Sequence, residues 1–358
     1  MNEATISFLK SAYKEYYFSK ADGIDDPPDI RSREFGYAPF GRGMVRHLSF
    51  RSKGEVVAEV LRQAPSSVYC SNAKYEAPTL PMEEKGWKGA ELIFDIDATD
   101  IPTGCKRRHD LWFCHACHAS GRLPKPQSCP NCKKAATEVF HGTCEKCLGA
   151  AKDHARRVVD FLCSDFGMKE ELAHIYFSGN RGYHLHVFDE RFFGLDQQAR
   201  LEIADYISGS GLPSSATLKA QLKRGQGARA GWMRRIAAAL GEGQTGEGDP
   251  KPSVAEAIES QSAKIDKAVT IDVHRVFRLG GTLHGTSGML KMKVRSLADF
   301  DPMRDPVVLS EEDVSLRVSF YPKFTIMGSV YGPFGDEVVS VPTYAAIGML
   351  TRGLAEVA

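Results

Sequence analysis

The stretch Glu-Leu-Ile-Phe-Asp-Ile-Asp at residues 91–97 decides how the rest of this chain is interpreted. It is a short apolar run, and it predicts a β-strand. Successive side chains of a strand point to opposite faces, so Asp95 and Asp97 share one face while Phe94 and Ile96 share the other. Neighbouring carboxylates repel one another, and a hard divalent cation such as Mg²⁺ or Mn²⁺ relieves that repulsion. The pair is therefore a candidate metal site, with a charged strand end that faces solvent as the open alternative.

A third carboxylate, Asp272, lies in the segment 269–274, which also has strand character. Together with the first two carboxylates it would complete a two-metal site. Two such ions can activate an attacking hydroxyl and neutralise a leaving pyrophosphate. A buried structural aspartate is the alternative for this residue.

Cationic and hydrogen-bonding residues gather at two predicted glycine-rich turns. The first turn covers residues 178–182 of a hairpin predicted over 174–188, and the second covers residues 280–285. An arginine at such a turn can clamp a phosphate group with two parallel hydrogen bonds. The candidate residues at the two turns are Ser178, Arg181, His184, Arg278 and His284.

Seven of the nine cysteines lie between residues 105 and 147, and six of them form three Cys-x2-Cys pairs. A dense cluster within a larger chain favours metal binding over disulfides. Seven cysteines and one histidine would supply the eight ligands of two tetrahedral Zn²⁺ sites, which would be closed and therefore structural. One site with spare thiols is the alternative. The simplest pairing puts Cys114, Cys117, Cys129 and Cys132 in one site, and Cys105, Cys144 and Cys147 with His109 or His141 in the other.

The composition bounds the class of protein. The chain has 358 residues, 42% of them hydrophobic and 25% charged, with a formal net charge of +1. These values exclude wholesale disorder and a polycation, and the length suggests about two domains or one domain with insertions. No apolar run approaches the roughly 18 residues of a membrane span, and the first residues carry charges where a signal peptide is apolar. We expect a cytoplasmic protein that makes no membrane contact.

A basic segment interrupts the second half of the chain. Between residues 210 and 241 there are six basic and no acidic residues, and a glycine-rich stretch that is typical of a flexible linker follows. The segment predicts a helical insertion. Its arginines Arg229, Arg234 and Arg235 could contact nucleic-acid phosphates, with a solvated helix face as the alternative.

Taken in order, these motifs resemble the catalytic (small) subunit of archaeal and eukaryotic DNA primases, in the archaeal style. The matches span nearly the whole chain, and the cysteine pairs fall where that family carries its zinc motif. The matching segments are residues 13–17, 33–35, Arg46, 91–97, 178–184, Asp272 and 282–285.

The resemblance implies a mixed α/β (α+β) primase catalytic fold with an RRM-like sheet, a zinc-binding insertion and a variable helical insertion. The segments expected from it are the N-terminal part of the core at 1–104, the zinc insertion at 105–147, the core continuation at 148–209, the basic insertion and linker at 210–266, and the C-terminal part of the core at 267–358.

The resemblance also implies an activity, namely template-directed synthesis of short RNA primers on single-stranded DNA from NTPs. It implies that Asp95, Asp97 and Asp272 bind two Mg²⁺ or Mn²⁺ ions and that the candidate residues of the two turns bind the triphosphate of the incoming nucleotide. Glu34 and Arg46 would lie at the same cleft. The implied partner is the large, iron–sulfur subunit of a primase heterodimer, in the nucleoid-associated replication machinery of an archaeal cell.

Three positions depart from the family's pattern. Asn180 stands where the eukaryotic turn has a second arginine, Gly280 stands where proline is frequent, and Thr286 stands where some members carry a lysine. Lys291 is a candidate substitute for that lysine. Two alternative functions stay open at this point: a non-catalytic zinc-ribbon protein that binds nucleic acid, and a primase-related repair polymerase.

Overall fold

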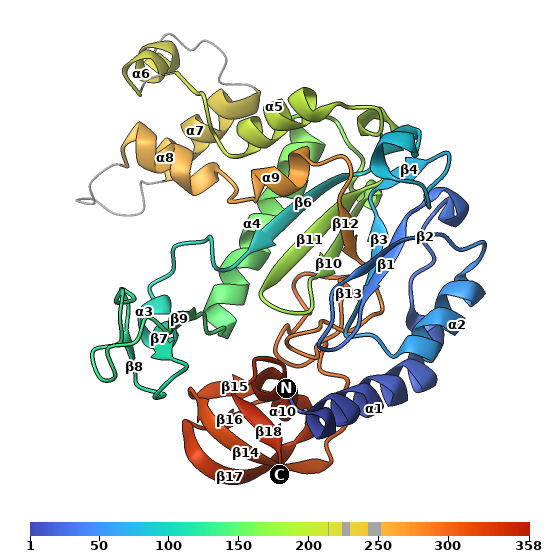
Figure 1. Ribbon diagram of the computed structural model, residues 1–358. Coiled ribbons are helices and arrows are strands. Elements are labelled where there is room, and N and C mark those ends of the chain that lie inside the picture. Colours follow the sequence, from blue (N-terminus) through green and yellow to red (C-terminus); the bar gives the residue numbers. More distant parts are fainter. Residues whose placement is uncertain (214, 224–229, 243–251) are drawn as a thin grey trace.

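Two four-stranded antiparallel sheets stand side by side in the middle of the protein (Figure 1). The computed structural model describes residues 1–213, 215–223, 230–242 and 252–358. The first sheet has the order β13-β10-β11-β6 and the second has the order β12-β3-β1-β2. Their strands are β1 (Phe35–Ala38), β2 (Val45–Leu48), β3 (Ser67–Ser71), β6 (Leu92–Asp97), β10 (Ala173–Phe177), β11 (Gly182–Val187), β12 (Val276–Arg278) and β13 (Met292–Lys293).

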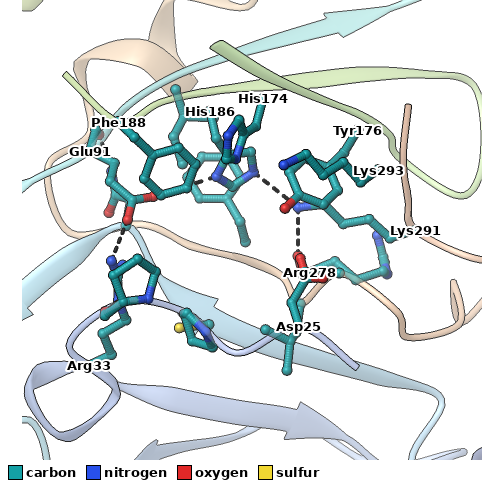
Figure 2. A pocket seen from close by; sticks show the side chains of 18 of the residues that line it. Asp25, Arg33, Glu91, His174, Tyr176, His186, Phe188, Arg278, Lys291 and Lys293 are labelled. Carbon is teal, nitrogen blue, oxygen red and sulfur yellow. Dashed lines mark hydrogen bonds and ion pairs between the residues drawn. The ribbon is translucent and has the colours of Figure 1, made fainter. Parts of the chain in front are cut away.

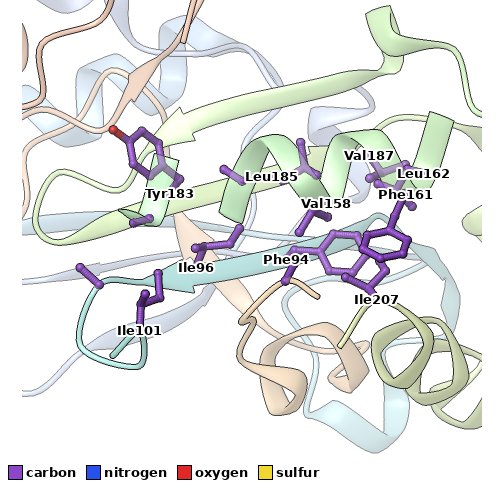
Figure 3. Close-up of a cluster of buried hydrophobic side chains, with 14 of the residues drawn as sticks. Phe94, Ile96, Ile101, Val158, Phe161, Leu162, Tyr183, Leu185, Val187 and Ile207 are labelled. Atoms are coloured by element: carbon purple, nitrogen blue, oxygen red, sulfur yellow. The ribbon is translucent and has the colours of Figure 1, made fainter. Parts of the chain in front are cut away.

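One face of the first sheet is covered by the long helix α4 (Glu145–Ser164) (Figure 3). Phe94 and Ile96 of β6 and Leu185 of β11 share a fully buried core with Val158 and Phe161 of α4. Each apolar side chain of this size contributes about 1.5–3 kcal/mol when it is buried. Because side chains alternate along a strand, this packing turns the intervening residues of β6 and β11 toward the opposite face.

A second core joins the second sheet to helices from both ends of the chain. Tyr13 and Tyr17 of α1 (Glu3–Lys20) are fully buried in it together with Val56 and Val60 of α2 (Lys53–Gln63). The C-terminal helix α10 (Thr343–Thr351) belongs to the same core. The two termini lie close together (Figure 1), and the backbone N–H of Val357 donates to Thr5 Oγ1 at 3.3 Å.

The C-terminal region forms its own sheet, and the cysteine-rich insertion packs against this sheet. The sheet order is β17-β14-β18, and Phe113 of the insertion stacks on Phe320 of β14, with ring centroids 5.6 Å apart. Phe140 of the insertion likewise packs edge-on against Tyr321. The elements are α3 (Lys106–His109), β7 (Leu111–Cys114), β8 (Ser120–Arg122), β9 (Thr137–Phe140), β14 (Asp313–Tyr321), β15 (Phe324–Ile326), β16 (Ser329–Tyr331), β17 (Phe334–Pro342) and β18 (Ala355–Val357).

The described parts of the basic segment form helices, but their cations are not all free for nucleic acid. Arg235 is only 6% exposed, and its Nε lies 3.0 Å from the buried carboxylate of Asp165. Its guanidinium also pairs with Asp160 and lies 3.8 Å from the ring centroid of Phe161. The hypothesis that Arg235 contacts phosphate is therefore wrong for this structure, and Arg229 lies outside the described residues. The helices around it are α5 (Gln197–Ile207), α6 (Ser215–Lys223), α7 (Gly231–Glu242) and α8 (Val254–Gln261).

The strand predicted at residues 269–274 is instead the short helix α9 (Lys267–Ile271) followed by a turn. The carboxylate of Asp266 accepts hydrogen bonds from the backbone N–H groups of Ala268 and Val269 and so caps the helix. This local capping outweighs the strand propensity of the β-branched residues that suggested a strand.

The remaining elements are short. A hairpin of β4 (Ala73–Tyr75) and β5 (Trp87–Ala90) adjoins the second sheet, and single-turn 3₁₀ helices connect other elements in the described part of the chain. No helix of the described residues has the length and apolar character that crossing a membrane requires. The 3₁₀ helices are Ala21–Gly23, Ile30–Ser32, Met82–Glu84, Glu170–Leu172 and Glu190–Phe192.

Replacing Arg235 tests the structural role that its burial assigns to it. In Arg235→Met, the carboxylate of Asp165, which is 3% exposed, loses its closest cation. A buried charge left without its partner costs about 3–5 kcal/mol, and urea unfolding should show a loss of that size. Arg234→Met is the matched control, because Arg234 is 45% exposed and should cost less than about 1 kcal/mol. Unchanged stability with weakened DNA binding in Arg235→Met would restore the hypothesis of a phosphate contact.

Candidate active site

The carboxylate pair of β6 lies next to the first glycine-rich turn, because β6 pairs with the strand β11 that follows this turn. In the antiparallel register of β6 and β11, Asp97 lies opposite Gly182 and Asp95 lies opposite His184. Residues that face each other in this way project on the same side of the sheet. His184 Nε2 lies 3.7 Å from Asp95 Oδ1, and Arg181 Nη2 lies 3.8 Å from Asp97 Oδ2. The structure thus brings together the aspartate pair and two of the cationic or hydrogen-bonding residues that the sequence singled out.

The two aspartates form an electrostatically strained pair. Burial raises the pKa of Asp95 to about 7, and repulsion from Asp97 and then from Asp266 adds to the rise. Carboxylates in this condition gain most from a bound cation, which replaces lost solvation and cancels the repulsion. Hard oxygen ligands of this kind suit Mg²⁺ or Mn²⁺.

Asp272 lies at the end of α9 and points its carboxylate at its own chain. Its Oδ1 accepts a hydrogen bond from the backbone N–H of His274 at 2.9 Å, and its carbonyl accepts one from Asn72 Nδ2 at 3.2 Å. Among the described residues, Asp95, Asp97 and Asp272 do not form a group whose oxygens all lie within 4.8 Å of one another. The three aspartates therefore do not form a closed three-carboxylate cluster in this structure.

Asp266 is an acidic neighbour of the pair that sequence reasoning missed. Its backbone N–H donates to the carbonyl of Asp95 at 2.9 Å, and its charge helps to raise the pKa of Asp95. It went unnoticed because residue 266 was assigned to the end of the basic helical insertion and linker, and not to the start of a helix whose backbone is bonded to β6. A search for helix caps, which finds an aspartate just before a short helix, would have found it.

Tight backbone packing fixes the first turn against β6. The backbone N–H of Ser178 donates to the carbonyl of Gly182 at 2.9 Å, and that of Ala98 donates to the carbonyl of Arg181 at 2.9 Å. A Cβ atom at Gly182 would lie 2.0 Å from the carbonyl oxygen of Ile96, so no other residue fits there. Glycine is thus required because two backbones approach each other closely.

The second turn is tied to the first. Arg278 donates through Nη1 to the carbonyl of Ser178 and through Nη2 to Ser67 Oγ, both at 3.5 Å. The hydroxyl of Ser287 donates to the carbonyl of Gly179, and that of Tyr13 donates to the carbonyl of His284 at 2.9 Å. These bonds hold the residues of the two turns as one constellation.

Donor atoms in this constellation lack partners. Arg181 Nε, His184 Nδ1 and Arg278 Nε are buried without a hydrogen-bond partner in the described part of the chain. Burial holds the pKa of His184 and of His284 well below the usual value, and nearby cations, including Arg278, push both further down. Buried unpaired donors and several cations in one place call for a polyanion. A triphosphate has the required charge and number of oxygens.

Two groups of metal-ligating side chains lie in the cysteine-rich region. In what we call the ribbon group, the ligand atoms of Cys114, Cys117, Cys129 and Cys132 all lie within 4.8 Å of one another. In what we call the knuckle group, Cys105, His109, Cys144 and Cys147 do the same. Four thiolate or imidazole ligands in each group match a closed tetrahedral site.

The structure decides between the two histidines that the sequence offered. His109 Nε2 lies 3.1 Å from Cys147 Sγ, while its Nδ1 lies 2.8 Å from Asp110 Oδ1. His141 Nδ1 instead lies 3.1 Å from the other oxygen of Asp110. A carboxylate behind a ligating histidine orients the ring, so Asp110 is a supporting residue that the sequence did not reveal.

Comparison with known proteins places this site in a family. The family described as DNA primase small subunit matches residues 140–295. The DNA primase small subunit PriS of Nitrosopumilus maritimus is 34% identical, and that of Cenarchaeum symbiosum is 35% identical, each over the full length of both chains. That of Thermoplasma acidophilum is 32% identical over 96% of this chain and 98% of its own. The chain belongs to the DNA primase small subunit family.

Membership in the primase family confirms several expectations. The resemblance, the mixed α/β primase fold and the class of enzyme, a nucleotidyltransferase, are all borne out. The similarity spans the catalytic segments as well as the cysteine-rich region. It therefore does not favour a non-catalytic zinc-ribbon protein or a repair polymerase.

Glu34 and Arg46 form an ion pair in which the Glu34 carboxylate is buried and the Arg46 side chain is 35% exposed. Arg46 grips the carboxylate through Nε at 2.9 Å and Nη2 at 3.2 Å, and Lys85 and the backbone N–H of His47 also donate to it. Burial raises the pKa of Glu34, but these hydrogen bonds lower it by more. Glu34 and Asp272 both act on the pKa of Tyr75. The pair therefore lies on the Asp272 side of the site.

A cavity of about 480 Å³ lies at the other end of the first sheet from Asp97 (Figure 2). None of the three predicted metal-binding aspartates lines it. Figure 2 shows Tyr176, His186 and Phe188 on one side of it and Arg33 and Asp25 on the other. Gly280 helps to shape this region, because a Cβ atom there would lie 2.1 Å from Asp25 Oδ2. This contact is a physical reason for glycine at a position where the family often has proline.

Lys291 lies in that cavity and is already bonded. Its Nζ donates to the carbonyl of Arg278 at 2.7 Å and lies 3.1 Å from His186 Nε2. His186 in turn approaches Glu91 at 3.6 Å, and Glu91 pairs with Arg33. Burial lowers the pKa of Lys291 to about 7. Lys291 is therefore part of an internal network, and the structure does not favour it as a substitute for the lysine that Thr286 replaces.

The raised pKa of Asp95 predicts that Mg²⁺ binding depends on pH. In the metal-free fold a pKa of about 7, against 3.8 for an ordinary aspartate, means that the folded state keeps a proton that the unfolded chain has lost. The group therefore destabilises the fold as pH rises from about 4 to about 7. Mg²⁺ must displace that proton, so its apparent affinity should fall about tenfold per pH unit below 7.

Thermal unfolding with and without Mg²⁺ at pH 6 and pH 8 measures this dependence. We expect a larger rise of Tm with Mg²⁺ at pH 8 than at pH 6 for the unmodified protein. Asp95→Asn is the control and should lose the difference between the two pH values. An equal Mg²⁺ effect at both pH values in the unmodified protein would contradict the assignment of Asp95 as a metal ligand.

Proposed function

We propose that this chain is the catalytic subunit that makes short RNA primers on single-stranded DNA for replication, by template-directed nucleotidyl transfer. One observation carries the proposal. Two crowded carboxylates on β6 face a set of buried, unpaired donors on two glycine-rich turns. A metal-binding pair beside a polyanion cradle is the equipment that phosphoryl transfer from a nucleoside triphosphate requires.

In this proposal Asp95 and Asp97 hold two Mg²⁺ or Mn²⁺ ions. Asp272 joins them by turning its carboxylate away from the backbone N–H of His274. The bound ions would lower the pKa of the attacking 3′-hydroxyl and offset charge on the leaving pyrophosphate.

Arg181 and Arg278 hold the triphosphate, and Ser178, His184 and His284 donate hydrogen bonds to it. The 3′-hydroxyl oxygen attacks the α-phosphorus of the incoming NTP, the bond to the β-phosphate oxygen breaks, and the hydroxyl proton leaves to solvent. The cradle stabilises the negative charge that builds on the departing pyrophosphate. Glu34 and Arg46 brace the Asp272 side of the cleft.

Zinc and a partner subunit complete the proposal. Four soft or borderline ligands at each of the ribbon and knuckle groups favour structural Zn²⁺, two ions in total. The relatives are named small subunits, which supports a larger partner. We propose the iron–sulfur large subunit as that partner, in a heterodimer at the nucleoid.

Substitutions at the acidic residues test the proposal. Asp95→Asn, Asp97→Asn and Asp272→Asn should each lower incorporation of labelled NTP on poly-pyrimidine DNA with Mn²⁺ by about 100-fold or more, because metal stabilisation is worth several kcal/mol. Asp266→Asn is the matched control and should keep activity within about tenfold.

The same assay separates three failures. Full activity in Asp272→Asn with loss in Asp266→Asn would make Asp266 the third ligand. Unchanged activity after removal of both Asp95 and Asp97 would refute the proposed mechanism. A preference for dNTPs, together with a requirement for an existing primer, would point to the repair polymerase instead.

Metal analysis tests the two zinc sites. We expect two Zn²⁺ per chain in the purified protein and one in either Cys129→Ser or Cys147→Ser, because each variant breaks one group of four. Cys163→Ser is the control, since Cys163 belongs to neither group. Two Zn²⁺ retained by either group variant would contradict the proposed ligand sets.

A further inference from the structure

A narrow groove continues from the two glycine-rich turns toward the cysteine-rich insertion. Asn180 of the first turn and Thr286 and Ser287, which follow the second, line it on one side. Phe140 of β9 and Arg352 line it as well. The groove thus begins where the proposed triphosphate cradle ends, away from the aspartates of β6.

The end of α10 is fastened to the second turn. Thr351 Oγ1 donates to the carbonyl of Thr286 at 2.7 Å, and the backbone N–H groups of Thr286 and Ser287 donate to His284 Nδ1 at 3.1 and 3.4 Å. Arg352 is the next residue and caps the helix. Its position relative to His284 is therefore set by direct hydrogen bonds and not by a loose tail.

The guanidinium of Arg352 is held but incompletely satisfied. It lies over the ring of Phe140, 4.6 Å from the centroid. Burial raises the pKa of Tyr321, and the charge and hydrogen bond of Arg352 oppose that rise. Arg352 Nε is buried without a partner in the part of the chain that the structure describes. An oriented guanidinium with a spare buried donor is suited to an anion.

The groove has the charge and size for a phosphate group. None of the residues that line it is acidic, and Lys323 and Arg352 supply positive charge. Arg352, Arg278 and Arg181 all push the pKa of His284 down, so positive charge is continuous from the cradle into the groove. The groove has a volume of about 110 Å³, room for three or four water molecules at roughly 30 Å³ each. That space is sufficient for a phosphate group.

We infer that this groove is a subsite for the terminal phosphate of the incoming nucleoside triphosphate and that Arg352 binds that phosphate. The inference rests on the proposed function and extends it. With the α-phosphate at the metal ions beside Asp95 and Asp97, the triphosphate crosses the cradle past His284. Its last phosphate then reaches the groove. Arg352 thereby distinguishes triphosphates from shorter nucleotides.

Binding measurements with one nucleotide series test this subsite. The full chain with Mg²⁺ and no template is titrated calorimetrically with a ribonucleoside triphosphate, the matching diphosphate and the matching monophosphate. Arg352→Ala should weaken triphosphate binding about tenfold to hundredfold, the usual effect of a lost charged hydrogen bond, and should leave diphosphate and monophosphate binding unchanged. The triphosphate affinity of Arg352→Lys, which keeps the charge, should lie between that of Arg352→Ala and that of the unmodified chain. Arg317→Ala, an exposed arginine of the same region, is the matched control and should bind like the unmodified chain.

Other outcomes of these titrations lead to different conclusions. Equal weakening of triphosphate and diphosphate binding in Arg352→Ala would place Arg352 outside a terminal-phosphate subsite. Unchanged triphosphate binding in Arg352→Ala, while Arg181→Ala loses it, would overturn the inference and leave the proposed function standing. Absence of triphosphate binding by the unmodified chain would overturn both. Phe140→Leu removes the ring under Arg352 and keeps the guanidinium. Triphosphate binding that is weakened in Arg352→Ala but not in Phe140→Leu supports direct contact between Arg352 and the phosphate over a structural role.

Discussion

The site depends on the packing of α4 against one face of the β6–β11 pair. Phe94, Ile96 and Leu185 are buried against that helix, and the strict alternation of a strand then leaves Asp95 and His184 no choice but the opposite face. A shift of register by one residue would put both carboxylates into the core, where an unpaired charge costs far more than the packing gains. The apolar contacts that stabilise the fold therefore also determine on which face of the sheet Asp95 and His184 lie.

The second constraint is electrostatic, and it acts on the aspartate pair of β6 and on the residues of the two turns. Asp95 and Asp97 repel each other on β6, and around the two turns burial and the charges of Arg278 and Arg181 hold the pKa of His284 well below its usual value. His184 approaches Asp95 at 3.7 Å and Arg181 approaches Asp97 at 3.8 Å, and both distances are longer than a direct hydrogen bond. Direct pairing would relieve the repulsion and close the site. Because the two turns are held by backbone hydrogen bonds instead, each set remains available for its own ligand of opposite charge.

The sequence was most informative where a local pattern controls the structure. A short apolar run identified β6, and the hairpin around the first turn was predicted as well. Cys-x2-Cys spacing identified six of the cysteines in the two cysteine-rich groups, while the choice of His109 over His141 came from the structure. It was least informative where burial changes the meaning of a charge. Arg235 and Lys291 are typical surface residues by type, yet each is held inside the protein by partners from distant segments. The helix α9 was missed for a related reason, because a single capping contact from Asp266 outweighed the propensity of the residues after it.

The cysteine-rich insertion has a direct physical connection to the proposed chemistry. His109 belongs to the knuckle group, and the carboxylate of Asp110 binds His109, His141 and the backbone N–H of Gly142 together. A Cβ atom at Gly142 would lie 2.7 Å from the carbonyl oxygen of His109, so the segment that follows β9 packs closely against His109. The ring of Phe140, two residues before Gly142, lies against the guanidinium of Arg352. A metal ion at the knuckle group would therefore fix one wall of the groove next to the cradle, so a structural metal site in the insertion would also influence the affinity for a nucleotide.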